Sequence, residues 1–69
     1  MTKLQAERIR RGMSQTALAA KAERLSASDI SRFERSYGRP YPAQADRLAR
    51  VLGIRAGELL DPADVPVER

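Results

Sequence analysis

Three arginines lie close together in the middle of the chain, directly after a serine and an aspartate. The stretch SASDISRFERSYGRP contains Arg32, Arg35 and Arg39, and Ser26 and Asp29 stand just before them. A guanidinium group carries five N–H donors in a planar fork, which matches the oxygens of a phosphate and the O6 and N7 atoms of guanine. Arginines at this spacing therefore point to contacts with phosphates and base edges.

The charge of the chain is unevenly distributed. The 69 residues have a formal net charge of +4. Residues 1–55 hold 12 basic and 5 acidic side chains, whereas residues 56–69 hold 1 and 4. Of the 13 basic residues, 11 are arginine. A GC-rich genome also enriches arginine, so the number of arginines alone does not indicate a function. Their positions in the sequence have to show whether they contact a ligand.

The residue types that are missing exclude several kinds of site. The sequence has no cysteine and no histidine, so it forms neither a disulfide nor a Cys/His zinc site. It also lacks a glycine-rich phosphate loop and a metal-ligand cluster, so we expect neither an enzyme nor a cofactor. No run of about 20 apolar residues occurs, and the first residues lack the apolar stretch of a signal peptide. These features favour a cytoplasmic protein.

Local signals predict an all-α fold. Ser14 and Ser26 are good N-caps, and Gly12 and Gly53 are good helix stops. Pro42 fits the first position of a helix. No strand pattern or repeat occurs. Together these signals predict helices over residues 3–11, 15–22, 27–35, 42–52 and 55–60.

The aspartate in the opening stretch has two interpretations. Asp29 follows Ser26 by three residues, the spacing of a capping box, so we interpret it as a capping acid that also offsets the helix dipole. The alternative is that its carboxylate accepts a hydrogen bond from the amino group of a cytosine. Ile30 and Phe33 are expected to face inward, which directs Arg32 to the other side of the helix.

The order of these signals resembles the lambda-repressor-like (Cro/XRE-type) DNA-binding domain, over about residues 4–60. The resemblance implies a compact domain of five short helices over 1–60, followed by an acidic, proline-containing tail over 61–69. The second and third helices would form a helix-turn-helix, with the third, about 27–35, in the major groove of double-stranded DNA. The positions that carry the resemblance are Arg8, Gly12, Ser14, Gln15, Leu18, Ala19, Ser26, Ile30, Glu34, Pro40, Leu48, Ala49, Leu52 and Gly53.

The resemblance also implies which residues meet DNA. The base-facing positions of the family hold Ala27, Ser28 and Arg32, of which only Arg32 can make a bidentate contact with guanine. Tyr37 is expected near a phosphate, although it could instead pack against the loop prolines. The positions where the family contacts phosphates hold Gln15, Arg35 and Arg39.

One pair of positions implies a structural role, and one turn departs from the family. Arg8 and Glu34 match a pair that forms a buried ion pair in relatives; the alternative is that Arg8 is another arginine facing DNA. Relatives usually place a single glycine before the apolar turn residue. Here Glu23 and Arg24 precede Leu25, so we expect a longer turn.

The resulting prediction is a sequence-specific transcriptional regulator. We expect a repressor of phage or mobile-element type that binds a two-fold DNA site as a homodimer. Leu59, Leu60 and Val65 are candidates for dimer contacts. The alternative is an antitoxin or protein-interaction module whose acidic tail covers a protein partner, a role that is compatible with DNA binding.

Overall fold

The computed structural model describes residues 1–63 of the chain. In this part there are no strands, and the only bridge joins Thr2 and Pro62. Val65 and the rest of residues 64–69 lie outside the described residues. The elements, in chain order, are α1 (Lys3–Arg10), α2 (Gln15–Ala22), α3 (Ala27–Glu34), α4 (Pro42–Leu52) and the 3-10 turn η1 (Ala56–Glu58).

The expectation of a fifth α-helix over 55–60 is wrong. That segment forms only one 3-10 turn, because its amides bond three residues back instead of four. Glu58 N donates to Arg55 O at 2.9 Å, and Asp61 N donates to Glu58 O at 3.0 Å. Gly57 weakens helix propensity at its centre, and Pro62 follows too closely for a further turn.

The ends of the helices are fixed by local side chains. The Ser14 Oγ accepts from the backbone N of Ala17 at 3.0 Å, as predicted for an N-cap. Thr2 caps α1 in the same way, which the sequence reading missed. Gly12 and Gly53 have φ of 69° and 68°, a left-handed conformation that only glycine adopts without strain.

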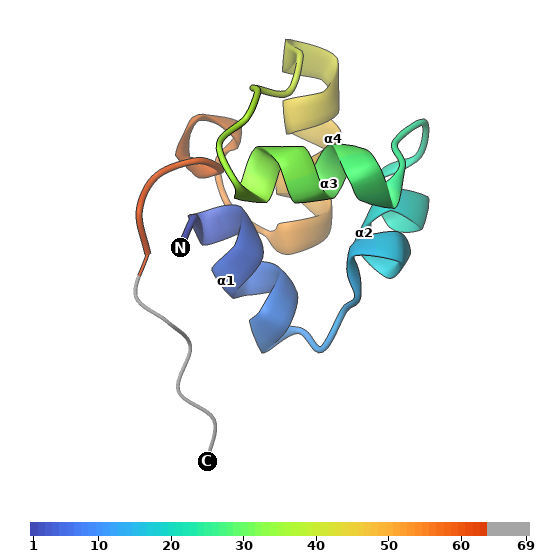
Figure 1. Cartoon of the computed structure of the whole chain (residues 1–69), viewed down its shortest axis with the longest axis horizontal. Coiled ribbons are helices and arrows are strands. Elements are labelled where there is room, and N and C mark those ends of the chain that lie inside the picture. The colour runs from blue at the N-terminus through green and yellow to red at the C-terminus, as the bar shows by residue number, and fades with distance from the viewer. Residues whose placement is uncertain (64–69) are drawn as a thin grey trace.

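The four helices surround one small core (Figure 1). α3 crosses the front of the molecule in Figure 1, with α1 below it and α2 to the right. Small residues such as Ala19 and Ala22 line the inner side of α2, so that α3 and α4 both approach it closely. The largest fully buried side chains come from every helix and from the segment after η1: Leu4, Leu18, Ile30, Leu48, Leu52 and Leu59.

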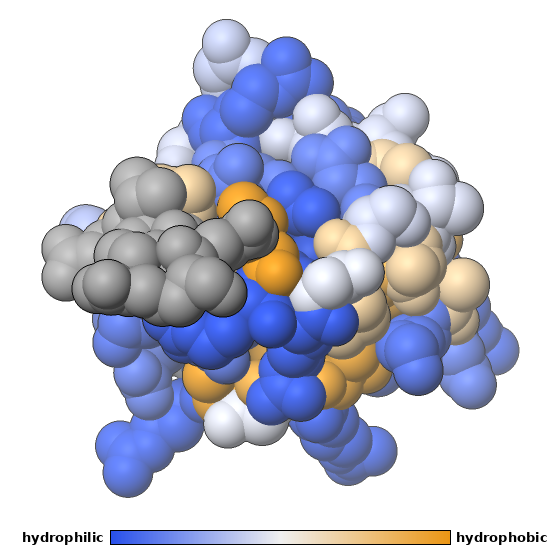
Figure 2. Space-filling model, turned by 90° about the horizontal axis from the view of Figure 1, so that it is seen from below, coloured by the Kyte–Doolittle hydropathy of each residue, from blue (hydrophilic) through white to orange (hydrophobic). Residues whose placement is uncertain are grey.

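One face of the molecule is mostly hydrophilic (Figure 2), as expected for a domain with this charge content. Figure 2 shows the face that lies below in Figure 1, where hydrophilic residues surround small areas of hydrophobic ones. Some apolar residues are only partly buried where they pack against the core, among them Met13, Val51 and Ile54.

The α2–α3 connection is longer than a one-glycine turn and has an unusual backbone. Glu23 and Arg24 both have positive φ, at 63° and 55°. Glu23 also has ψ of 147°, in a region that is otherwise almost confined to glycine. The extra residue predicted from the sequence is therefore accommodated by two consecutive residues with positive φ, and Ser26 then caps α3.

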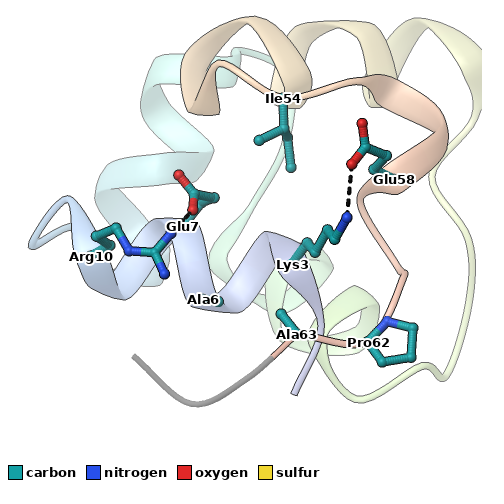
Figure 3. Close-up of a pocket in the computed structure, with 8 residues that line it drawn as sticks. All are labelled: Lys3, Ala6, Glu7, Arg10, Ile54, Glu58, Pro62 and Ala63. Carbon is teal, nitrogen blue, oxygen red and sulfur yellow. Dashed lines mark hydrogen bonds and ion pairs between the residues drawn. The ribbon is translucent and has the colours of Figure 1, made fainter. Parts of the chain in front are cut away.

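The two ends of the described chain are joined in a terminal clasp, residues 1–4 against 58–63. Lys3 Nζ pairs with Glu58 Oε2 at 2.8 Å at the edge of a hollow that Ile54 also lines (Figure 3). The clasp also has three backbone hydrogen bonds: Lys3 N to Asp61 O at 2.8 Å, Leu4 N to Leu59 O at 2.9 Å, and Ala63 N to Met1 O at 2.8 Å.

Candidate nucleic-acid interface

The outward face of α3 borders a shallow hollow, called here the recognition hollow. Ile30 and Phe33 point the other way and are 0% and 5% exposed, so the helix has one core face and one open face. All three positions expected to face bases meet at this hollow, together with two of those expected near phosphates. Its lining residues are Gln15, Ala27, Ser28, Ser31, Arg32 and Arg35.

The first turn of α3 is held by the predicted capping box. Ser26 Oγ accepts from Asp29 N at 3.2 Å, and Asp29 Oδ2 accepts from Ser26 N at 2.9 Å. Asp29 Oδ1 forms an ion pair with the guanidinium of Arg32. The hydrogen bond from the Ser26 backbone, followed by the contact with Arg32, holds the pKa of the Asp29 carboxyl below its ordinary value. Both oxygens of the carboxylate thus have partners, one in the N-cap residue and one in α3.

Arg32 stands between two hollows. It lines the recognition hollow and also a second one, called here the loop-side hollow, between α3 and the connection to α4. Its side chain is 58% exposed despite the ion pair with Asp29. The loop-side hollow is lined by Asp29, Arg32, Phe33, Gly38, Arg39, Tyr41 and Gln44, which places the exposed Arg39 on the same side of α3 as Asp29.

Arg35 and Tyr37 form a stacked pair at the C-terminal end of α3. Arg35 NH2 donates to Ser31 Oγ at 2.8 Å, and its guanidinium carbon lies 5.5 Å from the centre of the Tyr37 ring. Tyr37 is 75% exposed, so it stacks on an arginine and its ring is largely open to solvent. Ser31 was not singled out in the sequence, although its position four residues before Arg35 places both on one helix face.

Arg8 and Glu34 form the ion pair that the family resemblance implied. Arg8 Nε donates to Glu34 Oε2 at 2.6 Å and NH2 donates to Oε1 at 3.1 Å, a bidentate contact between α1 and α3. Arg8 NH1 also donates to the carbonyl of Met13 at 2.9 Å. The two side chains are 13% and 3% exposed, so Arg8 is not an arginine that faces DNA.

Gln15 is connected to the same carboxylate. Its Nε2 donates to Glu34 Oε1 at 3.1 Å, a contact that the sequence reading missed. One amide hydrogen and the amide oxygen of Gln15 remain for another partner at the start of α2. The Glu34 carboxylate therefore belongs to the buried ion pair and also binds Gln15 at the edge of the recognition hollow.

A family model for helix-turn-helix domains of the Cro/C1 type matches residues 4–59. The chain belongs to this family. In the Cro/C1-type domain α2 and α3 are the helix-turn-helix, and the protein is a DNA-binding transcription regulator. The comparisons with curated proteins and with solved structures gave no significant match.

Two further observations concern the Cro/C1-type domain as far as the structure describes it. Within residues 1–63 no three Asp or Glu side chains come together in a way that could hold a metal ion. In the same part of the chain, no helix has both the length and the hydropathy needed to cross a membrane.

Proposed function

We propose that the protein is a repressor that reads a two-fold DNA site as a homodimer, with α3 of each subunit in the major groove. The observation that carries this proposal is the recognition hollow, where Ala27, Ser28 and Arg32 lie together on a face of α3 that is directed away from the core. An α-helix fits the major groove with one such face directed at the base edges.

The three side chains give α3 a limited ability to read bases. Ala27 can pack against a thymine methyl group, and Ser28 can exchange hydrogen bonds with several bases. Arg32 alone can select guanine, through two parallel N–H groups directed at O6 and N7. Each subunit therefore discriminates strongly at about one position.

The residues around the hollow are suited to hold phosphates. Gln15 lies at the N-terminal end of α2, where the helix dipole also favours an anion. Arg35 and Tyr37 lie at the other end of the interface, and Arg39 lies in the connection beyond them. Contacts on both sides of α3 would fix its register in the groove without carrying sequence information.

The limited readout supports a dimer, because two half-sites add their binding free energies. Of the three apolar residues considered for a dimer contact, Leu59 is 1% exposed and belongs to the core, so it is not available to a partner. Leu60 is partly exposed and stays a candidate. Val65 lies outside the described residues.

Selection from a randomised double-stranded DNA pool tests the proposal directly. We expect an inverted repeat whose half-sites are roughly 10–10.5 bp apart, or a multiple of this, with a preferred guanine in each half. The selected site, placed over a promoter, should lower reporter expression when the protein is present. Enrichment of a single unrepeated half-site would contradict the dimer, and increased expression would contradict the repressor.

A further inference from the structure

Asp29 has two partners at once, one for each carboxylate oxygen. Oδ2 accepts hydrogen bonds from the backbone N of Ser26 at 2.9 Å and from its Oγ at 3.1 Å. Oδ1 pairs with NH2 of Arg32, one turn further along α3. The N-cap therefore fixes the carboxylate, and the carboxylate in turn fixes the end of the Arg32 side chain.

The pairing leaves Arg32 able to contact a base with two hydrogen bonds. The two hydrogens on NH2 belong to different edges of the guanidinium fork, one shared with Nε and the other with NH1. Whichever of them Asp29 accepts, the other edge keeps two parallel N–H groups for O6 and N7 of guanine. The ion pair and a bidentate base contact are therefore compatible.

The ion pair with Asp29 restrains the Arg32 side chain, so that it loses less conformational entropy when it binds DNA. An arginine with 58% exposure would otherwise sample many rotamers, and ordering it in the groove would weaken binding. Asp29 lines the loop-side hollow but not the recognition hollow, so it holds the guanidinium from one side only. The recognition hollow stays accessible to a base edge.

The negative charge of Asp29 also favours sites that contain guanine over sites that lack it. A carboxylate in the first turn of the recognition helix repels every DNA sequence through the phosphates, whereas Arg32 gains a contact only where guanine is present. A capping box does not require this charge, because a neutral glutamine at the third helical position also completes it.

We infer that Asp29 is a specificity-determining positioning residue, which holds Arg32 ready for guanine and weakens binding to DNA that lacks it. This inference rests on the proposed function, in which α3 enters the major groove and Arg32 reads a base.

The test compares wild type, Asp29→Asn, Arg32→Ala and the double variant. Their dissociation constants are measured on the DNA site selected from the pool and on versions with its preferred guanine replaced. We expect Asp29→Asn to reduce the preference for guanine by roughly two- to tenfold and to tighten binding to the replaced sites. In the Arg32→Ala background, Asp29→Asn should leave base preference unchanged.

Ser26→Ala is the matched control for the cap. This variant loses the hydroxyl that bonds to Asp29 N and to Asp29 Oδ2, but the backbone N of residue 26 still donates to Oδ2 and holds the carboxylate. Its melting temperature should therefore fall while its base preference stays close to the wild-type value. An equal loss of base preference in Ser26→Ala and Asp29→Asn would mean that Asp29 acts through helix stability alone, and would overturn the inference.

The remaining outcomes separate the inference from the proposed function. If Arg32→Ala keeps the guanine preference, the assignment of Arg32 as a base reader fails, and the inference fails with it. If Arg32→Ala loses that preference while Asp29→Asn keeps it in full, only the inference fails. If Asp29→Asn does not fold, the NMR order parameter at Nε of Arg32 in the wild type tests the inference instead. An Arg32 as mobile as the exposed Arg50 of α4 would overturn the inference.

Discussion

Gln15 and Glu34 are joined by a hydrogen bond of 3.1 Å, from the amide of Gln15 to the carboxylate oxygen that also accepts from Arg8. A residue proposed to hold DNA is thus fixed by a carboxylate whose main partner is a buried arginine. The same carboxylate stabilises the packing of α1 against α3 and orients a side chain at the edge of the recognition hollow.

Removing either member of the Arg8–Glu34 pair should strongly destabilise the fold. Arg8→Ala or Glu34→Ala leaves the remaining charge without its partner, at a cost of roughly 3–5 kcal/mol. The double variant should lose less than the sum of the two. Denaturant unfolding of all four proteins measures this coupling. The Lys3–Glu58 pair, which is far more exposed to solvent, is the control and should give nearly additive losses.

Gln15→Ala should weaken DNA binding while it leaves the stability of the fold nearly unchanged. Glu34 keeps its bidentate arginine in this variant, so the melting temperature should change little. Affinity for DNA should fall similarly on all sequences, because a phosphate contact carries no base information. Titrations on the selected site and on an unrelated duplex measure both effects. A loss confined to the selected site would assign Gln15 to a base instead.

Glu23→Gly should stabilise the protein. Glycine adopts the φ of 63° and ψ of 147° at this position without strain, while it also raises the entropy of the unfolded chain. We expect a net gain of about 1 kcal/mol in denaturant unfolding. Lys21→Gly, two residues earlier inside α2, should cost a similar amount instead. Destabilisation by both variants would mean that the turn is unstrained.

Arg32→Ala and Arg39→Ala should affect binding in different ways. Loss of a guanine reader should cost roughly 1–3 kcal/mol on the selected site and relax the preference at one position per half-site. Loss of a phosphate contact should weaken binding to all DNA sequences alike. It should also lower the slope of log K against log salt concentration by about one per contact. A panel of single-base variants at two salt concentrations distinguishes them. The reverse pattern would mean that α3 is docked differently.

Acid should weaken the first turn of α3. The folded-state pKa of Asp29 is lowered, chiefly by the hydrogen bond from the Ser26 backbone. A lowered pKa contributes stability above the pKa of the unfolded chain, and this contribution is lost as pH falls through the folded value. Melting temperatures should therefore fall below about pH 4, and less so in Asp29→Asn.

The helix boundaries were accessible from the sequence because each depends on neighbouring residues. Ser14, Ser26, Gly12 and Gly53 act within a turn of their own positions, and each has the predicted role in the structure. The structure of residues 55–60 could not be predicted in the same way. Its apolar residues suggested a helix, but Gly57 and the docking of the segment against α1 allow only a 3-10 turn.

The contacts within the candidate interface were only partly accessible. The ion pair between Asp29 and Arg32 has the i, i+3 spacing of a helix surface pair and could have been inferred. The bond from Gln15 to Glu34 could not, because it depends on the angle at which α2 meets α3. No local signal in the sequence reports that angle.

The terminal clasp has a consequence for the order of folding. Lys3 and Glu58 are 55 positions apart, so closing the clasp requires nearly the whole chain to be in place. The contacts of α2 with α3 close much shorter loops, and chains form such local contacts first. Hydrogen exchange should therefore find the amides of Lys3, Leu4 and Ala63, which donate across the clasp, opening together as one cooperative unit, earlier than those of α2 and α3. The first step of unfolding would then release both ends of the chain while the helix-turn-helix stays intact.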